Sequence, residues 1–292
     1  MKVETLLFRE ALQSAYGVLD WVPIGDGEIH RFHVPGDKPG RLNGWYVLFV
    51  DTIASGAFGS WKAGGTHTWC SRQPHTRQET EQVRQHIEQA RMRREVERVR
   101  GQKQAAELAR NWWRRAQPAD PGHAYLVAKQ VSAYTLRQRG DELLVPLYEY
   151  GHLVNLQRIG ADGRKRFLRG GKVQRSYSPL GTVKPDKPLC ICEGWATAAT
   201  LHHSGYAVAA AMNAGNLKPV AQALRMRYPH LQIIIAGDDD RQTEGNPGRT
   251  LANAAAVAAF AGVAFPDWPA EAPLTLTDYN DLVVWRRAHG RA

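Results

Sequence analysis

Two short apolar runs, each ending abruptly in acid and glycine, constrain the fold of this chain most. Leu189–Cys192 leads into Glu193 and then an Ala/Thr-rich stretch, and Ile233–Ala236 leads through glycine into Asp238 and Asp240. In an open α/β sheet, ligands and catalytic groups collect at the carboxyl ends of the strands. The sequence therefore predicts a mainly parallel sheet with these three carboxylates at one edge.

The acids in this pattern indicate a divalent cation. Asp238 and Asp240 occupy alternate positions, which suits oxygen ligation of a hard ion. Asp278 and Asp281 follow another short apolar segment, so we expect a third acidic strand end there. Carboxylates that converge raise one another's pKa, and this crowding favours one or two Mg²⁺ or Mn²⁺ ions over a simple solvated acidic turn.

The order strand, Glu-Gly, helix, strand, Asp-x-Asp resembles the Toprim domain of bacterial-type primases, topoisomerases and some nucleases. The likeness covers about residues 185–284 and is strongest to primases of conjugative plasmids and phages. Looser matches are His123–Leu126 with Lys129, and Gly245–Gly248. The resemblance implies an α/β fold: a Rossmann-like, mainly parallel sheet with helices on both faces.

The length of 292 residues suits two or three domains. We expect a small β-rich N-terminal α+β domain over 1–73, a charged helical linker over 74–117, a basic β-rich subdomain over 118–184 and the Toprim domain over 185–292. In the first of these, a helix over 4–15 should precede half-buried strands over 29–34, 45–50 and 57–61, with the aromatics Trp45, Phe49 and Trp61 mostly in a small core.

The charge points to nucleic acid. The net charge is +10 and the pI about 9.7, which favours a polyanionic partner. Between Gln157 and Ser176, seven Lys or Arg stand against one acid, a surplus of six. An ordinary solvated hairpin is the alternative to a nucleic-acid contact. The candidate contacts to template or nucleotide are Arg158, Arg164, Lys165, Arg166, Arg169 and Lys172. Asn213 and Asn216 lie in a later turn that could present amides to a phosphate. A helix cap explains Asn216 equally well.

The cysteines and histidines carry less chemistry. Three cysteines make no disulfide framework, and Cys190 and Cys192 read as inert packing groups inside a strand. His30, His33, His67 and Cys70 have spacings that zinc could use. Zinc is nevertheless not expected, because His30 and His33 would point to opposite faces of a strand. No signal peptide or membrane span is visible, so a bacterial cytoplasmic protein without a membrane partner is expected.

The resemblance implies a DNA primase that makes short RNA primers by metal-dependent nucleotidyl transfer. Asp238 and Asp240, with Asp278 or Asp281, would hold the ions, and Glu193 would bind a second ion or assist proton removal. Single-stranded DNA and ribonucleoside triphosphates are the implied partners, with a helicase or plasmid transfer machinery beside them, because no helicase domain follows in the sequence. A Toprim nuclease and a non-catalytic module that binds single-stranded DNA or docks a partner are the alternatives.

Overall fold

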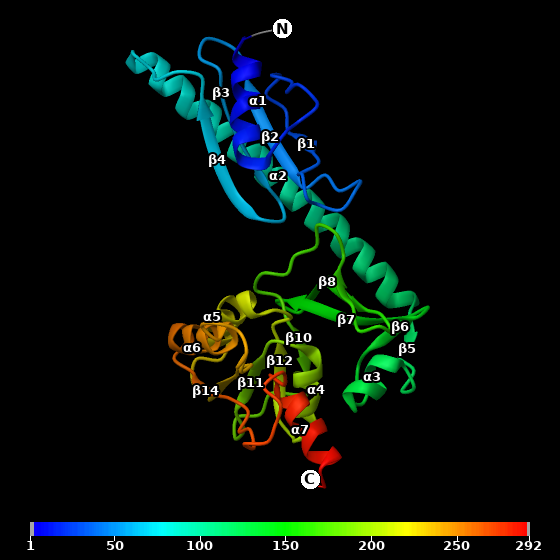
Figure 1. The fold of residues 1–292 in the computed structure, drawn as a ribbon. Helices are drawn as coiled ribbons and strands as arrows, with labels where there is room; N and C mark the ends of the chain where they lie inside the picture. The colour runs from blue at the N-terminus through cyan, green and yellow to red at the C-terminus, as the bar shows by residue number, and fades with distance from the viewer. Residues whose placement is uncertain (1–2, 291–292) are drawn as a thin grey trace. The chain divides into compact units, whose positions relative to one another are not determined.

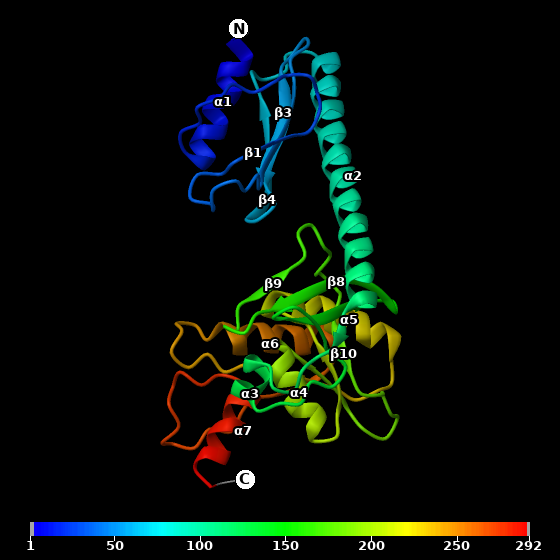
Figure 2. The ribbon, with the colours of Figure 1, turned by 90° about the vertical axis from the view of Figure 1, so that its right-hand side faces the viewer.

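A computed structural model describes residues 3–290, which divide into two compact units, one up to residue 100 and one from residue 101 (Figures 1 and 2). The division falls inside the helix α2 (Arg77–Arg115). The two halves of this helix belong to different units, so residues 74–117 are not a separate linker as the sequence suggested. Each unit is described by itself.

The first unit is a four-stranded antiparallel sheet with a helix on each face (Figure 2). Its elements are α1 (Val3–Tyr16), β1 (His30–Phe32), β2 (Gly44–Phe49), β3 (Ser55–Ser60), β4 (Gly64–Cys70) and the first half of α2. Phe8 and Leu12 of α1 pack on one face of the sheet, and Ala90 of α2 packs on the other.

Coverage on both faces changes one expectation. β2 and β3 are buried almost throughout rather than half-buried, because α2 covers the face that the sequence left to solvent. Trp45 lies in the core with no exposed surface, which confirms the core interpretation for that residue, and Trp61 packs partly buried beside it. The edge strand β4 was not predicted.

The histidines and the cysteine with zinc-like spacing make separate contacts in this unit. The Nε2 atom of His30 lies 2.9 Å from an Asp26 oxygen, and Nδ1 of His33 lies 2.9 Å from the Arg41 carbonyl oxygen. The ring of His67 stacks on Phe58. The thiol of Cys70 donates to the carbonyl of Arg72.

The second unit begins with an antiparallel sheet in the order β5-β6-β7-β8-β9. Its elements are the second half of α2, β5 (Gln117–Pro118), α3 (Ala124–Lys129), β6 (Arg137–Arg139), β7 (Glu142–Glu149), β8 (His152–Ile159) and β9 (Lys165–Phe167). The β7–β8 hairpin turns at Tyr150 and Gly151, as predicted. The small side chains Ala105 and Ala109 let α2 pack closely against leucines of this sheet.

The second sheet has the order β10-β12-β11-β13-β14. The elements are β10 (Ser178–Leu180), β11 (Leu189–Cys192), α4 (Trp195–His203), β12 (Ala207–Ala210), η1 (Ala214–Asn216), α5 (Leu217–Arg227), β13 (Ile233–Ala236), α6 (Pro247–Ala259), β14 (Gly262–Ala264) and α7 (Tyr279–Ala288). Four strands are parallel, and β10 joins one edge antiparallel. Helices α5 and α6 cover one face and α4 the other (Figure 1), which confirms the predicted architecture.

Alternation along β11 explains how both faces are filled. Leu189 and Ile191 pack toward α5 and α6, whereas Cys190 and Cys192 pack toward α4 and the first sheet of this unit. Burial raises the pKa of the Cys190 thiol to about 11 and that of Cys192 well above its usual value. Both cysteines are therefore packing groups, as predicted.

Among residues 3–290, the longest helix, α2, is charged along its length, and no helix combines the length and apolarity needed to cross a bilayer.

Candidate active site

The sheet order places a topological switch point between β11 and β13. The chain leaves β11 for β12 on one side and returns to β13 on the other, and ligands of open α/β sheets bind at such points. Cys192 pairs with Ala236 in the parallel register, so Glu193 and Gly237 follow at the same level. Glu193 and Asp238 therefore lie at the carboxyl ends of adjacent strands, which we call the rim.

Backbone bonds fix Glu193 at the rim. The amide of Met212 donates to the Glu193 carbonyl at 2.7 Å, and the backbone of Ala214 lies near enough to the Glu193 carboxyl to lower its pKa against the effect of burial. Met212 adopts a φ of 72°, an uncommon conformation for a non-glycine residue that is stored mostly where surrounding structure requires it. The turn after β12 thus serves to hold the glutamate.

Asp278 reaches the rim by a different route from the one predicted. It is the N-cap of α7 and accepts from the Asp281 amide at 2.8 Å. The expected third strand end is wrong, because β14 stops at Ala264 and the chain up to Thr277 contains three prolines, which cannot extend a sheet. A bond of 2.8 Å from the Asp239 amide to the Thr277 carbonyl ties this loop to the rim.

The rim carboxylates raise one another's pKa. Burial, with the charges of Glu193, Asp278 and Asp240, raises the pKa of Asp238 to about 8. Burial and neighbouring acids also raise the pKa of Glu193 and of Asp278. The Oδ1 atom of Asp238 is buried and has no hydrogen-bond partner among residues 3–290. Such an arrangement is costly for anions and suits a bound cation.

The fit of a metal ion rests on this unpartnered oxygen and on the donor type. Carboxylate oxygens are the ligands that Mg²⁺ and Mn²⁺ prefer. Within the described part of the chain, no three His, Cys, Asp or Glu side chains already stand as a ligand set. An ion at the rim would therefore require these carboxylates to turn toward it from their present positions.

The loop after β13 is held by the start of α6. Gly248 donates its amide to Oδ2 of Asp240 at 2.8 Å, and Oδ1 of Asn246 accepts from the Asp240 amide at 2.9 Å. A Cβ on Gly248 would lie 2.6 Å from the Asp238 carbonyl oxygen, so only glycine fits there. The resemblance at residues 245–248 thus has a physical basis.

The middle aspartate of the triplet is structural, which the sequence reasoning missed. Asp239 is buried, and its Oδ1 accepts at 2.7 Å from both Arg249 Nε and Asn246 Nδ2. Although burial acts in the other direction, these two donors lower the pKa of Asp239. The only signal in the sequence was Arg249 three residues after Asn246.

Asp281 engages a lysine rather than pointing into the cluster. Its carboxylate accepts from Lys129 Nζ at 2.9 Å and from the Thr277 amide at 3.2 Å. The neighbouring Asn280 donates to the carbonyl of Lys129 at 2.8 Å. These contacts link α3 to α7. We therefore assign Asp281 to positioning the start of α7 and not to direct metal ligation.

The helix α3 brings an additional side chain close to the rim. The Tyr125 hydroxyl is buried without a hydrogen-bond partner in the described part of the chain, and burial together with the charges of Asp278 and Asp281 raises its pKa. Lys165 of β9 lies 5.9 Å from the Tyr125 ring and lowers the pKa of Glu193 against the effect of burial. The resemblance at His123–Lys129 was the one signal that could have located Tyr125 and Lys129.

The six predicted basic contacts differ in availability. Arg158, Arg164 and Lys172 are paired with carboxylates at 3.2, 3.2 and 2.7 Å, respectively. The remaining three side chains are exposed and have no carboxylate partner among residues 3–290; these are Lys165, Arg166 and Arg169. With Lys165 near the rim, this group can meet phosphates directly.

Asn216 is not a phosphate contact. It is 3% exposed, and its Nδ2 donates to the carbonyls of Val173, Ser176 and Ala211 at 3.0, 2.9 and 2.7 Å. It joins the loop before β10 to the turn after β12. Asn213 lies half-buried in the same turn and stays a candidate.

Comparison with known proteins defines the class of the second sheet. Residues 188–288 match the Toprim domain family, a range that begins just before β11 and ends in α7. This part of the chain is a Toprim domain.

The wider chain is similar to DNA primases. It is 35% identical over 264 residues to the DNA primase TraC of Escherichia coli, covering 85% of this chain and 18% of that primase. A second Escherichia coli DNA primase TraC is 35% identical over 277 residues, 89% of this chain and 26% of that primase. The chain thus spans only 18% and 26% of the length of these curated relatives.

One solved structure is also similar, at a TM-score of 0.42 and 17% identity over 60% of this chain and 93% of the matched chain. That structure is of bacteriophage T7 lagging-strand DNA polymerase interacting with primase domains of two gp4 subunits bound to an RNA/DNA hybrid and dTTP.

Proposed function

We propose that this chain carries the catalytic centre of a DNA primase, which makes short RNA primers on single-stranded DNA by metal-dependent nucleotidyl transfer. The observation that carries the proposal is the rim itself, where the half-buried Glu193, Asp238 and Asp278 lie close enough to raise one another's pKa, and Asp238 has a buried oxygen without a partner among residues 3–290. The similarity to DNA primase TraC over most of this chain supports the choice of reaction.

Asp238 and Asp240, with Asp278, would hold one or two Mg²⁺ or Mn²⁺ ions, and Glu193 would take part in a second ion site or accept the proton of the attacking hydroxyl. When bound, such ions stabilise the negative charge that develops on the transferring phosphoryl group. Asp281, through Lys129, keeps the start of α7 in place so that Asp278 stays at the rim.

The exposed basic side chains of β9 and of the loop after it would hold the nucleic acid or the triphosphate. Lys165 stands nearest to the acids, since it acts on the pKa of Glu193, and Arg166 and Arg169 extend the positive surface away from it. Contacts of this kind position a strand without reading its sequence. A replicative helicase or plasmid transfer machinery would then deliver the template, in the cytoplasm of a bacterium.

The test is a priming assay with purified full-length protein, single-stranded DNA, labelled ribonucleotides, and Mg²⁺ or Mn²⁺. We expect oligoribonucleotides from the natural chain and none from the Asp238→Asn or Asp240→Asn variant. A matched control is Asp186→Asn, in the exposed linker before β11, which should prime normally. DNA cleavage without nucleotides would instead indicate a Toprim nuclease. Undiminished function of both rim variants would indicate a binding module.

A further inference from the structure

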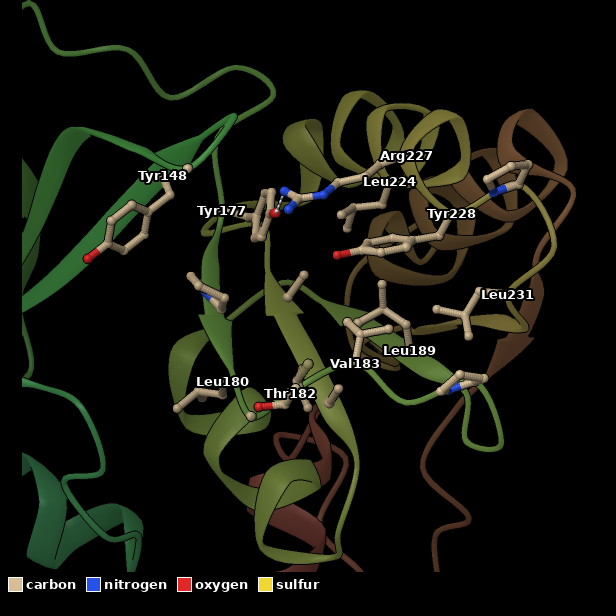
Figure 3. Close-up of a pocket in the computed structure, with 18 of the residues that line it drawn as sticks. Tyr148, Tyr177, Leu180, Thr182, Val183, Leu189, Leu224, Arg227, Tyr228 and Leu231 are labelled. Atoms are coloured by element: carbon tan, nitrogen blue, oxygen red, sulfur yellow. Dashed lines mark hydrogen bonds between the residues drawn. The ribbon is translucent and has the colours of Figure 1, made fainter.

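A groove along the edge of the Toprim sheet lies away from the rim (Figure 3). Its volume is about 810 Å³, and its floor includes Leu189 and Ala207 at the starts of β11 and β12. Glu193 follows the other end of the four-residue strand β11, about 13 Å along the sheet at the usual rise per residue. The floor of the groove is therefore separate from the acidic site, and Tyr177, which precedes the residue paired with Ala210, lies at the level of the rim but two strands, about 10 Å, to the side of β11.

Aromatic side chains form the walls of this edge groove. Tyr148 of β7 pairs in a single bridge with Tyr177, the residue before β10, and Tyr228 follows α5 on the opposite side. Figure 3 shows the ring of Tyr228 directed into the groove, with Arg227 reaching toward the hydroxyl of Tyr177. A second hollow of about 490 Å³ shares Tyr177 and Arg227 as a wall and continues past Tyr150.

The charge along both hollows is positive. Arg227 lies 3.5 Å from the Tyr177 hydroxyl and 5.4 Å from the Tyr228 ring, and Arg175 donates to the Tyr150 hydroxyl at 3.2 Å. Neither arginine has a carboxylate partner among residues 3–290. The one carboxylate in the lining, Glu149, is bound to Lys172 at 2.7 Å. Two guanidinium groups thus stand beside flat rings with no protein anion to neutralise them.

We propose that the edge groove and the second hollow together bind a stretch of single-stranded DNA. Bases would stack on Tyr177, Tyr228 and Tyr150, and the phosphates between them would meet Arg227 and Arg175. Alternating aromatic platforms and cations are the means by which proteins hold unpaired strands regardless of sequence. The choice of DNA over RNA rests on the proposed priming function, which gives the chain a single-stranded DNA template to hold away from the metal.

The first test uses the natural full-length protein and ultraviolet crosslinking to oligo-dT carrying 5-iododeoxyuridine, followed by peptide mass spectrometry. EDTA is present and ribonucleotides are absent. We expect adducts at Tyr150, Tyr177 or Tyr228. Adducts confined to other parts of the chain, such as the strand with Lys165, would overturn the proposal, and no variant needs to fold for this result.

The second test measures the affinity for labelled oligo-dT by fluorescence anisotropy in the same buffer. Tyr228→Ala and Tyr177→Ala should each weaken binding by about 5- to 100-fold, the effect of losing one stacked base. Tyr228→Phe and Tyr177→Phe keep the ring and should stay within about twofold of the natural protein. Equal affinity of the alanine and phenylalanine variants would overturn the proposal and leave the groove as a protein-docking surface.

A competition arm distinguishes the kind of strand. Unlabelled oligo-dT should displace the probe better than oligo-U, and the reverse order would overturn the assignment to DNA. Binding is measured without metal or ribonucleotides, so a negative result for the groove would not affect the conclusion from the priming assay. Failure to prime leaves the crosslinking and affinity results intact in the same way.

Discussion

At the scale of single residues, the three aspartates after β13 do three different things. Asp238 carries the unpartnered buried oxygen. Asp239 accepts hydrogen bonds from Arg249 and Asn246. Asp240 accepts a hydrogen bond from the amide of Gly248. The three identical side chains thus have different partners, because the backbone turns between them and directs each carboxylate to different surroundings. Only the first and third remain suited to a cation.

The raised pKa of Asp238 makes stability depend on pH in the metal-free protein. A folded-state pKa of about 8 lies above the ordinary value of about 3.9. The stability of the natural protein is therefore highest, as far as Asp238 is concerned, below about pH 4, and this contribution is lost as the pH rises to about 8. The side chain of Asp238→Asn cannot ionise, so the variant does not lose this stability. The variant should therefore gain stability over the natural protein between these limits, by at most about 1.4 kcal/mol per pH unit.

Urea unfolding in EDTA across this pH range measures the difference. The same variant should fail to prime, and Mg²⁺ should stabilise only the natural protein. A variant that is less stable than the natural protein at pH 8 would contradict the assignment of an uncompensated buried charge.

Gly248 gives a second prediction at this scale. In Gly248→Ala the new Cβ would press on the Asp238 carbonyl oxygen at 2.6 Å and on Oδ2 of Asp240 at 2.9 Å. We expect a large loss of priming with a stability cost of about 1–3 kcal/mol, typical of overpacking. Gly262→Ala is the control, because its Cβ would meet its nearest neighbour at 3.8 Å. Equal priming by the two variants would show that the rim tolerates displacement.

At the scale of elements, the short helix α3 and the terminal helix α7 act as one piece. Lys129 links them through Asp281 at 2.9 Å and through its own carbonyl to Asn280 at 2.8 Å. Burial alone would lower the pKa of Lys129, but the hydrogen bond to Asp281 and the charge of Asp278 raise it. The lysine therefore remains charged, and it holds the helix whose N-cap is Asp278.

Replacing Lys129 by Met should lower the unfolding free energy by about 1–3 kcal/mol, because it leaves Asp281 half-buried without its cation. The double variant Lys129→Met with Asp281→Asn should recover part of this loss, and Lys129→Arg should lose less than Lys129→Met. Chemical denaturation of the natural protein, of Lys129→Met, of Asp281→Asn and of the double variant measures the coupling. Strict additivity of the two single changes would contradict a direct interaction.

At the scale of the whole molecule, the chain has two sets of cores joined by one continuous helix. Leu12 and its neighbours fill one core of the first unit, and Leu147 lies in a core that the first sheet of the second unit shares with the Toprim sheet. The basic subdomain and the Toprim domain are thus bound by a common interior, whereas the first unit has its own.

Calorimetry of the full chain should show two transitions. Leu12→Ala should lower the temperature of only one transition, and Leu147→Ala that of only the other. Each substitution should cost its own unit about 2–5 kcal/mol of unfolding free energy, as is usual for a buried leucine. Mg²⁺ should raise only the transition that Leu147→Ala affects, since the rim belongs to that unit. A single transition shifted by both substitutions would show that α2 couples the two units into one cooperative structure.

Much of this molecule follows from local pattern alone. Apolar runs that break into acid and glycine predicted β11 and β13 and the parallel sheet, because strand periodicity and turn chemistry are local properties. The β7–β8 hairpin and the inert cysteines followed in the same way. The pairing of Glu193 with Asp238 followed from sheet topology, since parallel strands end at the same edge.

Only the tertiary structure decided what each polar group faces. It made Asp239 and Asn216 structural, gave Asp281 to Lys129, brought Asp278 to the rim on a helix cap, and buried both faces of β2 under α1 and α2. The partners in these contacts lie up to 152 residues apart in the chain. No local pattern records such a separation, and the choice between a free carboxylate and a satisfied one depends on it.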